Sequence, residues 1–133
     1  MGIHTAIRTI LSGYAGLTAL VSGNIYWLQA PEGTVFPYVT YGLVSQTPVH
    51  AMGADAGLEG PRFQVDAWSE SAAGMEDVSA QIKAALQDYS DTSAGVVIQR
   101  IFWENEIELV EEDTDKKRVI YHRAIDFTVW HEV

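Results

Sequence analysis

Cysteine is absent from the 133 residues, which excludes disulfides, thiolate metal ligands and thiol catalysis. Basic residues are scarce, because 8 Lys and Arg stand against 18 Asp and Glu, for a formal net charge of −10. A chain of this sign repels phosphate, so a nucleic-acid-binding module is not expected. Long apolar runs are also lacking, since Arg8, Ser12 and Gly16 interrupt the most apolar stretch. We expect neither a membrane span nor a signal peptide, but a soluble protein.

Sequence motifs for catalysis or ligand binding are missing too. There is no nucleophile elbow, phosphate-binding loop or dinucleotide glycine fingerprint. His122 and Asp126 share a predicted strand face, but about 13 Å separates the Cβ atoms of residues four apart on a strand, too far for a hydrogen bond. The histidines stand in none of the spacings typical of zinc sites; they are His4, His50, His122 and His131. The sequence therefore predicts no catalytic residue, no metal and no cofactor.

The residues that are present describe a folded protein. A composition of 47% hydrophobic and 20% charged residues is typical of a globule, and the length predicts a single domain over residues 1–133. Apolar stripes predict helices over residues 3–11 and 14–21, the first ended by Gly13. A longer helix is predicted over residues 72–88, capped by Ser69 or Ser71, with an apolar stripe of Met75, Val78, Ile82, Ala85, Leu86 and Tyr89.

Strand patterns occupy much of the remaining sequence. Alternation or β-rich composition predicts strands at residues 25–27, 38–44, 62–70, 96–112 and 118–133. Residues 50–61 are rich in Gly and Ala and predict a mobile loop. The order α, α, β, β, α, β, β predicts an α+β domain. It has an antiparallel sheet of about four strands, with the N-terminal helices and one amphipathic helix packed on it, and a long C-terminal hairpin.

The strand in "FPYVTYGLVSQTP", residues 36–48, is apolar on both faces. Pro37 has no N–H to donate to a ladder and fits the first position of a strand. Tyr38 and Thr40 lie on the outer face, which we expect a helix or a neighbouring subunit to bury. The inner face is predicted to be core and consists of Val39, Tyr41 and Leu43.

Carboxylates crowd the C-terminal hairpin and its turn. One interpretation is a hairpin kept soluble by charge, and the other is a surface that repels a polyanion. Because unpaired buried charge is costly, the hairpin is expected to face water, a lumen or a docking partner. Arg118 and two lysines follow the turn and offer cross-strand pairs. The candidate residues of this surface are Glu104, Glu106, Glu108, Glu111, Glu112, Asp113 and Asp115.

Three stretches together resemble a known family. They are "FPYVTYGLVSQTP", then "RFQVDAWSESAAGMEDVSAQIKAALQD", and the closing strand "AIDFTVWHEV". A Pro-Tyr strand, a strand of the type R-x-Q-V-D-x-W-S that leads into an amphipathic helix, and a final D-F-x-V-W strand are similar to tail completion, or tail terminator, proteins of long-tailed phages and gene transfer agents. The resemblance spans Ile3 to Trp130.

The resemblance implies a structural virion protein rather than an enzyme. Such proteins form a six-fold ring at the head-proximal end of the tail tube, stop its polymerisation and present a surface to the head connector, a stopper or adaptor protein. DNA passes through the lumen without specific binding. The implied partners are further copies of the chain, the tail tube protein and the head connector, and the implied location is the neck of a phage-like particle assembled in the host cytoplasm.

Two alternatives remain open at this point. A neighbouring head-completion or neck protein would also be a small, acidic ring former. A small ligand-binding α+β domain is the other alternative, because aromatic side chains could line a pocket. The candidates for such a lining include Trp27, Trp68, Trp103 and Trp130.

Overall fold

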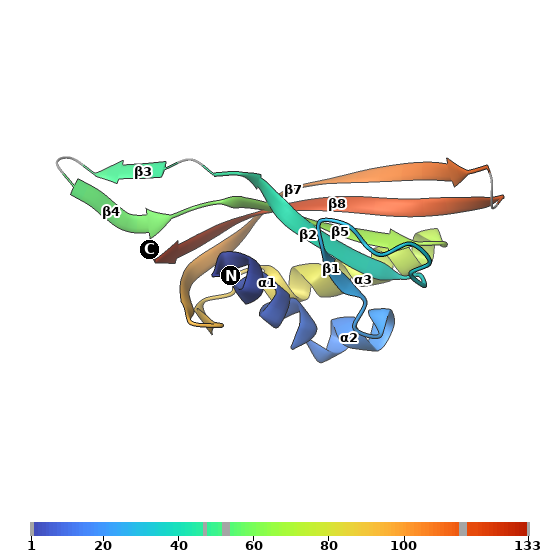
Figure 1. Cartoon of the computed structure of the whole chain (residues 1–133), viewed down its shortest axis with the longest axis horizontal. Helices are drawn as coiled ribbons and strands as arrows, with labels where there is room; N and C mark the ends of the chain where they lie inside the picture. Colours follow the sequence, from blue (N-terminus) through green and yellow to red (C-terminus); the bar gives the residue numbers. More distant parts are fainter. Residues whose placement is uncertain (1, 47, 52–53, 115–116, 133) are drawn as a thin grey trace.

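Three helices lie beneath one long, curled sheet (Figure 1). The computed structural model describes residues 2–46, 48–51, 54–114 and 117–132, and among these it describes side chains outside residues 48–58. A short hairpin and a long hairpin extend from opposite ends of the sheet.

The three helices predicted from apolar periodicity are confirmed among the described residues. They are α1 (Ile3–Ser12), α2 (Ala15–Val21) and α3 (Ala72–Leu86). The first ends at Gly13, whose N–H donates to the Thr9 carbonyl at 3.0 Å. The third begins after Ser71, whose Oγ accepts a hydrogen bond from the Gly74 N–H at 3.0 Å, as an N-cap does. The predicted stripe of α3 is buried along Met75, Val78, Ile82, Ala85 and Leu86.

The described residues form one sheet of eight strands. Four antiparallel strands form its centre, in the order β2 (Tyr38–Ser45), β5 (Arg62–Ser69), β8 (Arg118–Glu132) and β7 (Val96–Asp113). At one edge β1 (Ile25–Trp27) pairs with β2 in parallel, and at the other β6 (Asp91–Ser93) pairs with the start of β7. The short hairpin of β3 (Pro48–Ala51) and β4 (Ala54–Glu59) joins the end of β8.

The prediction of about four antiparallel strands is therefore right for the centre of the sheet and wrong for the whole. The loop predicted over residues 50–61 includes β4 and the end of β3. Gly and Ala give this segment little intrinsic strand preference. It is a strand because Leu58 and Glu59 pair with Glu132 and His131 at the far end of β8, and composition does not reveal that distant pairing.

The helices cover one face of the sheet, and the core lies between the two layers. Val39 and Tyr41 of β2 are buried there as predicted. Leu43 was predicted to join them, but it is 40% exposed, because it lies at the bulge where β2 loses its register with β5. The centre of the core holds the fully buried Phe63, Val65, Ile82, Leu86, Ile101, Ile125 and Phe127.

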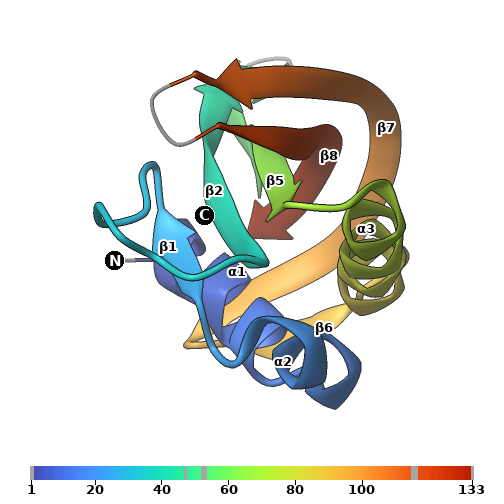
Figure 2. The same cartoon turned by 90° about the vertical axis from the view of Figure 1, so that its right-hand side faces the viewer.

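The opposite face of the sheet is concave. Figure 2 shows β7 arching over the top of the sheet above β2, β5 and β8. The curl brings the far end of the long hairpin back to the loop before β2, where the Arg118 guanidinium lies 5.0 Å from the centre of the Phe36 ring. The sheet is thus curled rather than flat.

Candidate interaction surfaces

A row of neighbouring rings crosses the concave face. Tyr38 lies with its ring centre 5.0 Å from Phe36 and 5.8 Å from Trp68, and Trp68 stacks on His122 at 3.7 Å. Thr40 is buried, and its Oγ1 accepts a hydrogen bond from Trp68 Nε1 at 3.0 Å. Within the chain, the outer face of β2 is therefore covered at Tyr38 and Thr40 by the neighbouring strand and its rings rather than by a helix, and contact with a neighbouring subunit stays a prediction.

The curl also changes the electrostatics of this row. Burial raises the pKa of Tyr38, and the negative charge of Glu111 raises it further, while Arg118 opposes this. At the end of the row, His122 Nε2 lies 3.3 Å from Asp66 Oδ2, and His122 Nδ1 lies 3.9 Å from Glu111 Oε1. The two carboxylates near His122 therefore come from the neighbouring strands β5 and β7.

A second cluster lies on the helix-covered side, around Arg123. The Arg123 side chain is only 7% exposed, and its Nη2 donates to Glu76 of α3 at 3.0 Å and to Glu108 of β7. Its Nε lies 3.6 Å from Glu106 Oε2. Burial alone would lower the pKa of Arg123, but the hydrogen bonds and charges of Glu76 and Glu108 outweigh it, and the pKa is raised. This cluster joins α3, β7 and β8 through one cation.

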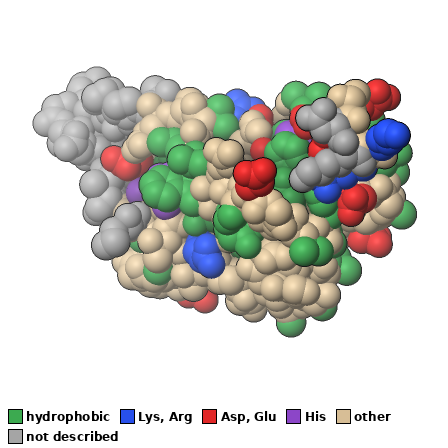
Figure 3. Space-filling view, turned by 45° about the vertical axis from the view of Figure 1, so that its right-hand side comes forward, with side chains coloured by type: hydrophobic (Ala, Val, Ile, Leu, Met, Phe, Trp, Pro, Cys, Tyr) green, Lys and Arg blue, Asp and Glu red, His purple; other side chains and the backbone are tan. Residues whose placement is uncertain are grey.

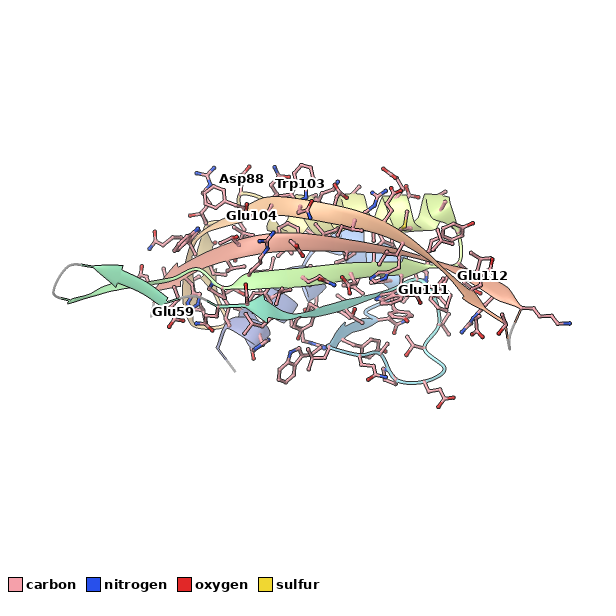
Figure 4. All side chains as sticks on the ribbon, turned by 90° about the horizontal axis from the view of Figure 1, so that it is seen from above. Glu59, Asp88, Trp103, Glu104, Glu111 and Glu112 are labelled. Carbon is pink, nitrogen blue, oxygen red and sulfur yellow. The ribbon has the colours of Figure 1, made fainter. Side chains whose placement is uncertain are left out.

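The carboxylates of the predicted acidic surface fall into two groups, one exposed and one paired with basic side chains. Glu104 and Glu112 are exposed, as expected of the hairpin (Figure 4). The side chain of Glu106 is only 22% exposed, and its Oε1 accepts from Lys83 Nζ at 3.0 Å. Asp113 lies 3.4 Å from Arg118 Nε, which is one of the cross-strand pairs expected. Asp115, the last candidate, lies outside the described residues.

The expectation that the whole run faces open space is therefore wrong for Glu106. The physical reason is a bulge in β7 between Trp103 and Asn105. After this bulge, Glu106 and Glu108 stand opposite Ile125 and Arg123 and share their helix-covered side. Two basic side chains compensate Glu106 there, so its burial leaves no unpaired charge.

Sequence reasoning did not identify a strip of exposed apolar side chains on β7, which we call the β7 surface. Its residues are between 42% and 64% exposed: Phe102, Ile107 and Leu109 lie on the concave face, and Trp103 and Val110 stand opposite Phe127 and Tyr121 on the helix-covered side. The alternation of Ile107 and Leu109 with glutamates is visible in the sequence, but it predicts an inner and an outer face. It does not reveal that apolar side chains stay exposed on both faces of this part of β7.

A second group of exposed apolar side chains lies at the opposite edge, and we call it the β1–β2 surface. It consists of Trp27, Leu28, Leu43 and Val44, which are 53%, 66%, 40% and 53% exposed. A shallow groove of about 250 Å³ runs along it, lined by apolar side chains of this surface and by Thr40, Gln64 and Asp66. A larger hollow of about 500 Å³ lies beside the loop before β2 and includes Glu70 and Arg118.

The tryptophans do not gather in one place. Trp27 contacts His4, and Trp68 contacts His122. Lys83 lies over Trp103, and the Trp130 ring lies against the backbone at Gly60. They are distributed over four strands and pack against different neighbours, which does not favour the idea of an aromatic-lined ligand pocket.

Metal and membrane features can be assessed for the part of the chain that the structure describes. Within it, no three His, Asp or Glu side chains converge as a metal site would require. No helix in these ranges is long and apolar enough to cross a bilayer.

The described residues form an acidic α+β protein with two separate strips of exposed apolar side chains. The sequence profile of the family described as tail completion protein gp17 matches residues 5–132. The chain belongs to this family, and it is a structural protein of phage tails, as the resemblance in its sequence implied. None of the curated proteins matches the chain.

Solved structures share the fold. A chain from the virion of a native gene transfer agent particle superposes with a TM-score of 0.71 at 17% identity, covering 99% of this chain and 96% of that one. A second structure, of a protein without a functional name, gives a TM-score of 0.61 at 15% identity and covers 96% of this chain and 92% of that one. The likeness extends over nearly the whole length of the chain.

Proposed function

We propose that six copies of this chain form a ring at the head-proximal end of a phage-like tail. The ring ends polymerisation of the tail tube and presents a surface to the head connector. The observation that carries this proposal is membership of the tail completion family over residues 5–132. The likeness to a gene transfer agent virion chain supports a place in such a particle.

The surface of the molecule supports self-assembly. A ring of identical subunits needs two different patches on each subunit that meet on rotation. The β7 surface and the β1–β2 surface are two such patches, exposed at opposite edges of one sheet. Exposed apolar strips of this kind are typical of interaction sites.

The charge of the chain supports a conduit for DNA. The net charge is −10, and the exposed carboxylates Glu104, Glu111 and Glu112 lie along the hairpin. In a ring they would repeat around the rim or lumen, where they repel phosphates within a Debye length of about 8 Å. The carboxylates that hold Arg123 contribute less, because its cation offsets part of their charge.

Native mass spectrometry of the purified chain, alone and mixed with its tail tube protein, tests this proposal. We expect a closed assembly of six chains in at least one of the two samples, and no retention of duplex DNA in a gel shift at physiological salt. A chain that stays monomeric in both samples contradicts the ring. Tight binding of DNA contradicts the acidic conduit.

A further inference from the structure

The two exposed apolar surfaces differ sharply in charge. Of the 18 carboxylates, only Glu32 precedes Asp55 in the sequence, so the β1–β2 surface is formed by a nearly uncharged part of the chain. The β7 surface is bordered by the exposed Glu104, Glu111 and Glu112, and by Glu108, whose charge Arg123 partly offsets. Figure 3 shows charged side chains gathered toward the right-hand end of the molecule, while the lower part of this face is mostly tan and green.

This charge difference selects the contacts that two copies can make. Two β7 surfaces placed together would bring like charges into apposition, which is unfavourable. A β7 surface placed against a β1–β2 surface meets fewer carboxylates, because Asp66 is the one carboxylate among the residues that line the groove, and apolar side chains are buried on both sides. Every large hydrophobic side chain that is exposed among the described residues lies within residues 20–44 or 97–119, the two segments that carry these surfaces.

Backbone hydrogen bonding is also available at both edges. On the side of β7 away from β8, the Ile101 carbonyl accepts from the Asp88 N–H and the Ile101 N–H donates to the Tyr89 carbonyl. Among the described residues, no backbone hydrogen bond is formed on that side of β7 beyond Ile101. Residues 102–112 of β7 therefore pair with β8 alone. On β2, pairing with β1 covers Val39–Tyr41 and leaves the outer side of residues 42–45 without a described strand partner. Such edges are templates for strand addition.

The faces match when the edges are joined. Ile107 and Leu109 stand opposite Ala124 and His122 of β8, on the concave face. The groove of the β1–β2 surface opens on that same face, because Thr40 and Gln64 line it. A sheet that continues from one copy into the next keeps its faces, so Ile107 and Leu109 would lie beside the groove of the neighbouring copy.

We propose that β7 of one copy lies along the β1–β2 edge of the next copy, so that the curled sheets join head to tail and the β7 side chains cover the neighbour's groove. This inference rests on the proposed function, since it names the contact by which the ring closes. It commits to a second copy of the chain as the occupant of both surfaces.

Cross-linking tests the contact directly, because the chain has no cysteine of its own. A variant with Val44→Cys and Ile107→Cys is oxidised and run on a denaturing gel. We expect a ladder of covalent oligomers up to the full ring. The matched control carries Val44→Cys and Ala84→Cys, with Ala84 exposed on α3, and should give no ladder.

The outcomes separate the inference from the proposed function. If the native mass shows assembly but the Val44 and Ile107 pair gives no ladder, the contact is wrong and the ring stands. If Ile107→Cys alone yields abundant dimers, β7 pairs with itself and the inference is overturned. If no assembly forms with or without the tail tube protein, both fail.

Charge variants provide a second readout that does not depend on register. Val44→Glu should weaken assembly at least about tenfold more than Val44→Lys, because the strand that reaches this edge is acidic. Ala84→Glu is the control and should assemble like the parent, and circular dichroism melts check that each variant folds. Equal weakening by Glu and Lys at position 44, or no weakening by either, overturns the inference.

Discussion

The stability of the acidic hairpin should depend on Glu106 and hardly at all on Glu104. Glu106 accepts from Lys83 at 3.0 Å and lies 3.6 Å from Arg123 Nε, with its side chain 22% exposed. Glu104 is an exposed residue of the same strand. Replacing Glu106 by Gln keeps its shape and removes its charge, and Glu104→Gln is the matched control.

The expected loss of stability for each variant follows from how far the replaced carboxylate is buried. An exposed ion pair contributes about 0–1 kcal/mol, whereas removing one member of a buried pair costs about 3–5 kcal/mol. Glu106 lies between these limits and compensates two cations, so we expect Glu106→Gln to lower the free energy of unfolding by about 1–3 kcal/mol. Glu104→Gln should change it by less than about 0.5 kcal/mol.

Urea unfolding followed by circular dichroism measures both. With a slope of about 2 kcal/mol per molar, the loss for Glu106→Gln lowers the midpoint by about 0.5–1.5 M. A double-mutant cycle with Lys83→Met shows how much of the loss belongs to the Lys83 pair. Equal midpoints for the two Gln variants would refute the division of the acidic run into structural and surface carboxylates.

Three further changes test the packing. Leu86→Ala should lower the free energy of unfolding by about 2–5 kcal/mol, since Leu86 is 1% exposed in the core, and an unchanged urea midpoint would mean that α3 does not pack on the sheet. Gly60→Ala should cost about 1–3 kcal/mol, because its Cβ would stand 2.7 Å from the Trp130 ring, and a neutral result would show that the ring moves aside at no cost. Burial lowers the pKa of His4, so the folded protein binds fewer protons than the unfolded chain as pH falls below the ordinary histidine value of about 6.5. His4→Phe should therefore lose less stability than the parent between about pH 7.5 and about pH 5, and equal losses would contradict the lowered pKa of His4.

The helices and the central strands could be predicted because their signals are local. The stripe of α3 and the Ser71 cap are visible within a few residues of sequence. The alternation of Arg62–Ser69 predicts a strand buried on one side, and every second residue of β5 is buried, beginning with Phe63.

The remaining features depend on register and curl, which composition does not encode. The bulge after Trp103 decides that Glu106 turns toward Arg123, and no sequence pattern marks it. The curl of the sheet brings Glu111 near His122 and Tyr38. The exposure of Ile107 was not predictable either, because an alternating strand has the same pattern whether its apolar side meets its own core or another subunit.

Electron microscopy of lysates from cells that produce the particle, with and without the gene for this chain, tests the central claim most directly. Without the chain, the account predicts filled heads separated from tails, and tails of irregular or excessive length, with joining restored by the parent gene and not by the Val44→Glu variant. Normal joined particles in the absence of the chain would contradict its role in tail completion.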